Sequence, residues 1–102
     1  MDAAISARQE DIAALCRRFG VKRLDLFGSA ASGGFDPRRS DFDFLADLGE
    51  QPSAAYVEAY FGLQESLESL LGRLVDLVTD RSLTNPYLRR SILQSRQPLY
   101  AA

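Results

Sequence analysis

Apolar residues recur along the chain with two different periods, and each change of period marks a change of element. Residues 5–19 have apolar side chains at helical spacing and are followed by Gly20, which is typical of a helix ended by a left-handed glycine. Residues 54–71 show the most continuous helical stripe and are followed by Gly72. The apolar positions of that stripe are Tyr56, Tyr60, Leu63, Leu67, Leu70 and Leu71.

Shorter segments between the helices alternate apolar and polar residues, which predicts strands. We expect strands at residues 21–27, 41–47 and 74–79, and a short edge strand at residues 98–100. One face of the second strand would carry Asp41, Asp43, Leu45 and Asp47, and the other Phe42, Phe44, Ala46 and Leu48. The alternation therefore predicts a sheet with one apolar face and one partly acidic face.

Asn85 followed by Pro86 is an N-cap signal that predicts a further helix. Two loops rich in glycine, proline and serine, at residues 28–40 and 49–53, are too short to divide the chain into domains. The order of the elements predicts one α/β domain over residues 1–102, with a small mixed β-sheet flanked by helices.

The composition narrows the chemistry by what it lacks. Lysine and arginine number 12 against 14 aspartates and glutamates, a net charge of −2, so nothing favours nucleic acid as the main partner. The absence of histidine excludes Ser-His-Asp and Cys-His catalysis and most zinc sites. Cys16 is the single cysteine, which excludes an internal disulfide. With no apolar run long enough to span a membrane and no signal-peptide pattern, we expect a soluble, cytoplasmic protein.

The most informative polar residues are Asp41 and Asp43, in a strand otherwise made of phenylalanine and leucine. Residues two apart on a strand share a face, with their Cα atoms about 6.5–7 Å apart. Like charges that close repel each other, but a divalent cation between them reverses the balance, and carboxylate oxygens are the ligands that Mg²⁺ selects. Hydrated carboxylates on an edge strand would give the same pattern.

A third acid strengthens the metal-site hypothesis. Asp76 interrupts an apolar run at residues 74–78. If the third strand pairs beside the second, Asp76 joins Asp41 and Asp43 in one cluster of carboxylates, the arrangement that two-metal phosphoryl transfer needs. On an open sheet face, Asp76 would simply be solvated.

The first strand ends at Gly28 and Ser29, where a glycine lets an anion approach the backbone and amides and a hydroxyl can bind phosphate oxygens. A Gly-Ser pair alone is more often a turn. Arg38 and Arg39 in the following loop, next to Ser40, are candidate phosphate partners or solvated arginines.

Two other acids are interpreted without a metal. Asp25 lies between two leucines, and we expect it to pair with an arginine or with water. Asp47 shares the face of Asp41 and Asp43 but lies farther from the loop end of the strand, outside the reach of the metal.

Taken together, these segments resemble the signature of the polymerase-β-like nucleotidyltransferases, and more narrowly the minimal (MNT-type) nucleotidyltransferases. The resemblance is carried by residues 26–29 (Leu-Phe-Gly-Ser), 40–45 (Ser-Asp-Phe-Asp-Phe-Leu) and 72–78 (Gly-Arg-Leu-Val-Asp-Leu-Val). It implies the polymerase-β-like fold and ATP as substrate, with two Mg²⁺ ions. A hydroxyl would attack the α-phosphate in line, and pyrophosphate would leave.

The resemblance also implies a role for each matching residue. Asp41 and Asp43 would bind both metals, and Asp76 would complete the catalytic metal site and help orient the acceptor. The nucleotide-binding residues would be Gly28, Ser29, Arg39 and Ser40. The chain departs from many members at residues 30–32, where alanine and serine replace an arginine.

Relatives of the minimal class are typically paired with a small helical HEPN-type ribonuclease toxin, onto whose tyrosine they transfer AMP. The resemblance therefore implies an antitoxin that acts by protein adenylylation. Two alternatives stay open. The chain could block the toxin by binding alone, or it could modify RNA or a small molecule whose acceptor domain lies on another chain.

Overall fold

The computed structural model describes residues 2–32 and 41–102. In chain order its elements are α1 (Ala3–Ser6), α2 (Gln9–Arg18), β1 (Arg23–Phe27), α3 (Ser29–Ser32), β2 (Phe42–Asp47), α4 (Ser53–Leu71), β3 (Val75–Thr79), the 3-10 helix η1 (Asp80–Ser82), α5 (Pro86–Ser95) and β4 (Gln97–Ala101). All four predicted strands are present. No helix in the described ranges is long and apolar enough to cross a membrane.

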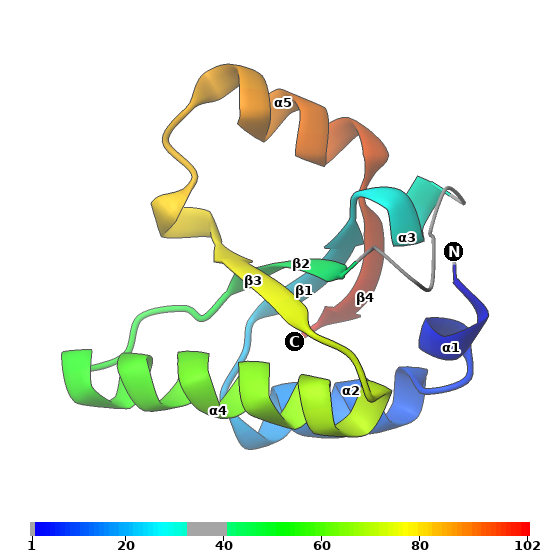
Figure 1. Cartoon of the computed structure of the whole chain (residues 1–102). Coiled ribbons are helices and arrows are strands. Elements are labelled where there is room, and N and C mark those ends of the chain that lie inside the picture. Colours follow the sequence, from blue (N-terminus) through cyan, green and yellow to red (C-terminus); the bar gives the residue numbers. More distant parts are fainter. Residues whose placement is uncertain (1, 33–40) are drawn as a thin grey trace.

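The four strands form a mixed sheet in the order β3-β2-β1-β4 (Figure 1). β1 pairs antiparallel with β2 and with β4, whereas β2 and β3 are parallel. A parallel pair needs a crossover between its strands, and α4 supplies it. This arrangement confirms the predicted small mixed sheet flanked by helices and places the second and third predicted strands side by side.

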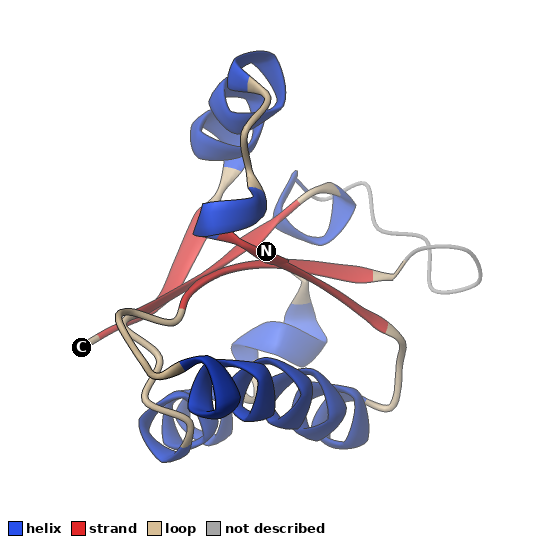
Figure 2. Ribbon diagram, turned by 90° about the vertical axis from the view of Figure 1, so that its left-hand side faces the viewer, coloured by secondary structure: helices blue, strands red, loops and turns tan. Residues whose placement is uncertain are grey.

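The helices cover both faces of the sheet. Figures 1 and 2 show α2 and α4 on one side of the strands and α5 on the other. Alternate residues of β2, namely Phe42, Phe44 and Ala46, are buried in the larger core, on the side of α2 and α4. On the opposite face, Ile92 of α5 packs with Leu45 of β2. The two faces of β2 are thus divided as the alternation predicts.

The first predicted helix is wrong in one respect, because it is broken into α1 and α2. The Asp2 side chain accepts a hydrogen bond from the amide of Ala4 and caps α1, and the Asp2 amide donates to the Ala30 carbonyl at 2.9 Å. This tie to α3 sets the direction of α1 apart from α2. Apolar spacing does not reveal the break, because Ile5 and Ile12 are both fully buried.

The predicted helix ends agree closely with the structure. Gly72 ends α4 in the left-handed conformation, with φ of 68°. Asn85 caps α5, since its side-chain oxygen accepts from the amides of Tyr87 and Leu88. These ends matter for the site because α4 leads directly into β3 and α5 crosses the face that carries the acids.

Candidate active site

Strand register brings the predicted acids together on the face of the sheet that α5 partly covers. Asp43 of β2 is the register partner of Phe27 of β1 and also of Asp76 of β3. Neighbouring strands lie about 4.8 Å apart, so Asp43 and Asp76 are adjacent residues in one line across three strands. We call this line of Phe27, Asp43 and Asp76 the acidic row, after its two aspartates. The third strand therefore pairs beside the second, as the predicted cluster of carboxylates requires.

Electrostatic coupling links Asp41 to the acidic row. The pKa of Asp43 is raised from 3.8 to about 6, first by burial and then by the charges of Asp76 and Asp41. Asp41 and Asp76 are exposed, whereas Asp43 is half-buried. Within the described ranges, none of the three carboxylates takes part in an ion pair. The site therefore accumulates negative charge that the described side chains do not neutralise.

Gly28 lies directly against the acidic row. Its φ is +70°, and a Cβ atom built on it would stand 2.5 Å from Oδ2 of Asp43. Both the backbone conformation and the lack of space require glycine at this position. The end of β1 therefore lies within van der Waals reach of the carboxylate, as expected for a loop and a metal ligand that share one substrate. Ser29 follows as the first residue of α3.

The segment after Ser29 contributes to packing rather than charge. Ala30 and Ala31 are 1% and 5% exposed and belong to the larger core. A long cationic side chain at either position would displace core residues, so the departure from the family's arginine is consistent with the fold. The other predicted cation and hydroxyl at this site, Arg39 and Ser40, lie outside the described residues, as does Arg38.

The carboxylates of Asp41, Asp43 and Asp76 are chemically suited to a hard divalent cation, although they do not form a closed coordination site. Carboxylate oxygens are the ligands that Mg²⁺ prefers. The pKa of Asp43 is raised first by burial and then by the charges of Asp76 and Asp41, and a cation would relieve that repulsion. Yet no group of three acidic, histidine or cysteine side chains in the described part of the chain is close enough to hold an ion. The structure brings Asp43 and Asp76 together and leaves Asp41 at the exposed start of the strand.

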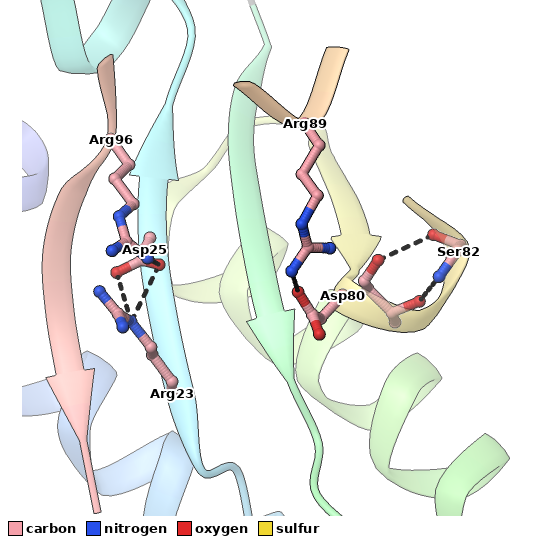
Figure 3. A network of polar contacts seen from close by, with 7 residues as sticks. Arg23, Asp25, Asp80, Ser82, Arg89 and Arg96 are labelled. Atoms are coloured by element: carbon pink, nitrogen blue, oxygen red, sulfur yellow. Dashed lines mark hydrogen bonds and ion pairs between the residues drawn. The ribbon is translucent and has the colours of Figure 1, made fainter. Parts of the chain in front are cut away.

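A second group of acids lies on the same face, farther along the strands. Asp25 is 1% exposed, and Arg23 and Arg96 both approach it at 3.2 Å (Figure 3). Asp80 pairs with Arg89 of α5 at 3.0 Å. The predicted pairing of Asp25 with an arginine is confirmed.

These side chains line a cavity of about 290 Å³, which we call the arginine pocket. Its lining comprises Arg23, Asp25, Leu45, Asp47, Asp80, Arg89, Leu93 and Arg96. Asp47, the register partner of Arg23, lies here and accepts a hydrogen bond from the Gly49 amide at 2.8 Å. It is therefore four register positions from Asp43, which agrees with its exclusion from the predicted metal site.

Tyr60 of α4 belongs to the apolar stripe that the sequence predicts, but it also carries a polar hydroxyl near the site. Its ring packs against the core, but its hydroxyl donates a hydrogen bond of 2.7 Å to the Leu77 carbonyl of β3. Burial, followed by the charges of Asp76 and Tyr56, raises the pKa of this hydroxyl above its ordinary value. Helical spacing alone places Tyr60 correctly but does not show what its hydroxyl contacts.

Known proteins share both the sequence and the fold. Residues 10–99 match the model of the nucleotidyltransferase domain family. The protein adenylyltransferase MntA of Thermococcus cleftensis is 44% identical over 69 residues, which cover 68% of this chain and 66% of MntA. The Methanocaldococcus jannaschii protein MJ1379, which is assigned as a protein adenylyltransferase, is 40% identical over 75 residues, or 74% of this chain and 73% of its own.

Solved structures agree with these sequence relatives. A structure described as a minimal nucleotidyltransferase superimposes with a TM-score of 0.80 at 37% identity, over 97% of both chains. A chain from a toxin–antitoxin complex crystallised with AMP-PNP superimposes with a TM-score of 0.71 at 25% identity, over 92% of this chain and 73% of that one.

Proposed function

Because the chain belongs to the nucleotidyltransferase domain family, as a minimal nucleotidyltransferase of the protein adenylyltransferase class, we propose a specific reaction for it. In the cytoplasm it transfers AMP from ATP to a tyrosine hydroxyl of a helical HEPN-type ribonuclease toxin, in a Mg²⁺-dependent reaction, and so acts as the antitoxin. The observation that carries this proposal is the acidic row, with Gly28 packed against the Asp43 carboxylate.

Asp41, Asp43 and Asp76 would hold the Mg²⁺ ions, which neutralise the triphosphate and the charge that develops on it. Gly28 leaves room for the β- and γ-phosphates beside Asp43, and the Ser29 hydroxyl and the predicted Arg39 and Ser40 bind phosphate oxygens. Asp76 would accept a hydrogen bond from the acceptor hydroxyl and direct the hydroxyl oxygen toward the α-phosphorus. The bond from the hydroxyl oxygen to the α-phosphorus forms as the bond from that phosphorus to the bridging oxygen breaks. The hydroxyl proton passes to the Asp76 carboxylate, and pyrophosphate leaves. Positioning and charge neutralisation do this work, so histidine is not required.

The surroundings of Asp76 favour a protein as the acceptor. Leu74 is 68% exposed and lies directly before β3, two residues before Asp76. An exposed leucine beside an exposed carboxylate suits a partner surface that combines an apolar contact with a hydroxyl. Relatives support the same choice, since MntA is a protein adenylyltransferase and the solved relative with AMP-PNP is part of a toxin–antitoxin complex.

The test is transfer of label from α-³²P-ATP to the small helical protein encoded next to this chain's gene, with Mg²⁺ present. We expect labelled tyrosine on that protein, and no label with the double variant Asp41→Ala, Asp43→Ala. Asp47→Ala is the matched control, because Asp47 lies on the same strand but in the arginine pocket. Mass spectrometry of the labelled peptide identifies the acceptor residue.

The burial of Ala30 and Ala31 favours a second candidate, an antitoxin that acts by binding alone, because this segment offers the triphosphate no cation. A tight complex without label, equally formed by the double variant, would support it. Absence of both label and complex would contradict both candidates and direct the search to RNA or small-molecule acceptors.

A further inference from the structure

The strand that carries Asp76 lies at the edge of the sheet. Among the described strands, β3 pairs only with β2, so the backbone groups on its other side have no partner in any of them. The Leu74 carbonyl accepts from the Phe42 amide and therefore points toward β2. The amide and carbonyl groups of successive residues point to opposite sides of a strand. The backbone groups of Asp76 therefore also point toward β2, while those of Val75 and Leu77 point toward the open edge.

Three side chains of α4 occupy that edge. The Tyr60 hydroxyl donates to the Leu77 carbonyl at 2.7 Å, and Gln64 Nε2 donates to the Val75 carbonyl at 3.1 Å. The Val75 amide in turn donates to Glu68 Oε2 at 3.0 Å. Spaced four residues apart, Tyr60, Gln64 and Glu68 lie on one stripe of the helix. Their hydrogen bonds reach the residues on both sides of Asp76.

The site needs such a restraint for a physical reason. Asp43 and Asp76 are neighbouring like charges that repel each other across the β2–β3 pair. A parallel pair is also slightly less stable per residue than an antiparallel one. Repulsion acting on an edge strand with one neighbour would displace β3 outward unless a group on the outer side held it.

We propose that Tyr60, Gln64 and Glu68 are positioning residues that clamp β3 so that Asp76 stays in register with Asp43 during nucleotidyl transfer. This inference rests on the proposed function for its catalytic part. None of the three side chains needs to touch substrate, because each acts through the backbone of β3. Together they form what we call the α4 clamp.

The first test compares Tyr60→Phe with Tyr56→Phe. Tyr56 lies one turn earlier on α4 and is also half-buried, and its hydroxyl has no hydrogen bond to β3 in the part of the chain that the structure describes. We expect Tyr60→Phe to lower kcat by about 10-fold or more, since small displacements of a reacting group are costly. The KM for ATP should stay unchanged, because Gly28 and Ser29 lie at the end of β1. Tyr56→Phe should alter neither constant.

The second test uses amide hydrogen exchange measured by NMR, which needs no activity. In Tyr60→Phe, the amides of Asp76 and Val78, which face β2, should exchange faster than in the wild type, while amides of β1 keep their rates. Glu68→Met should have the same effect, and Glu68→Gln should restore wild-type exchange and kcat because it keeps an acceptor for the Val75 amide.

The outcomes separate the clamp from the proposed function. Equal exchange in Tyr60→Phe and Tyr56→Phe would overturn the clamp, whatever the activity. Faster exchange in β3 with an unchanged kcat would overturn its positioning role and leave it a purely structural contact. A wild-type chain that transfers nothing to any acceptor would instead overturn the proposed function.

Discussion

Aspartates lie in two groups on the same face of the sheet, one next to arginines and the other next to further carboxylates. In the arginine pocket, Asp25 is buried between Arg23 and Arg96, and Asp80 pairs with Arg89. In the acidic row, burial and then the charges of Asp76 and Asp41 raise the pKa of Asp43 to about 6. In the arginine pocket, arginines of the same chain neutralise the negative charge, and the ion pairs stabilise the fold. In the acidic row, the negative charge is not neutralised by the described side chains, which lowers stability and suits a site that receives a cation with its substrate.

The largest expected effect is the loss of transfer in Asp43→Asn. Asparagine keeps the shape of the side chain but removes a charged metal ligand, and activity should fall by about 10²–10³-fold. Asp47→Asn changes the same residue type on the same strand and should retain activity. Transfer of labelled AMP measures both variants, and equal activity of Asp43→Asn and the wild type would contradict the assignment of the acidic row.

The compensated group should behave in the opposite way. Asp25→Ala leaves the partly exposed guanidinium groups of Arg23 and Arg96 without their carboxylate, and should lower the free energy of unfolding by about 2–3 kcal/mol. The specific activity of the folded fraction should change little. Urea unfolding measures the first quantity and initial rates the second. A loss of activity without a loss of stability would place Asp25 in the active site.

A pair of glycines separates backbone strain from the contact with the carboxylate. Gly28 and Gly72 have nearly the same φ, +70° and +68°, but a Cβ atom on Gly72 would meet nothing within 4 Å. Gly28→Ala and Gly72→Ala should therefore both lose about 1 kcal/mol of stability from the backbone conformation. Only Gly28→Ala should also lose ATP binding, as measured by calorimetry. Equal ATP affinity in the two variants would show that the approach of the loop to Asp43 is not needed.

The smallest expected effect is a pH-dependent difference in stability. The folded chain binds the proton of Asp43 more tightly than the unfolded chain, since the folded pKa of about 6 exceeds the ordinary 3.8. The wild type is therefore penalised above pH 6 and recovers as the pH falls through 6 toward 4. Without metal, Asp43→Asn should melt a few degrees above the wild type at pH 8, and the gap should close by pH 4.

Adding Mg²⁺ at pH 8 tests whether a cation offsets the destabilising charge of Asp43. The ion should raise the melting temperature of the wild type and leave that of Asp43→Asn unchanged, because only the wild type offers the full set of carboxylates. A rise of the same size in both variants would mean that the ion binds elsewhere. Thermal melts with Ca²⁺ in place of Mg²⁺ provide a check on selectivity.

Local patterns predict most of the fold, because alternation and capping act over a few residues. The strands, the glycine that ends α4 and the cap at Asn85 all follow from such patterns. The break between α1 and α2 does not, because it depends on a hydrogen bond from Asp2 to Ala30, far along the chain. Apolar spacing is the same whether that helix is continuous or broken.

For the candidate site, the sequence predicts residue types but not their geometry, and the roles of these residues stay predictions. Asp76 could be placed beside Asp43 only by assuming a strand order that the register then provides. The sequence predicts that Asp25 pairs with a neighbouring arginine or with water, and Arg23 is such a neighbour, but Arg96 lies 71 residues away, beyond any local pattern. The α4 clamp leaves one signal in the sequence: Tyr60, Gln64 and Glu68 carry polar groups spaced four residues apart along the border of the apolar stripe.

The two borders of the sheet limit how this protein can recognise a partner. α4 occupies the outer edge of β3, and the opposite border, β4, contains Pro98, which has no amide, and a shift of register against β1. Strand addition binds through the backbone and depends little on sequence, and both borders discourage it. Under the proposed function, recognition of the toxin would then use side chains rather than strand pairing, and its specificity would change with single substitutions.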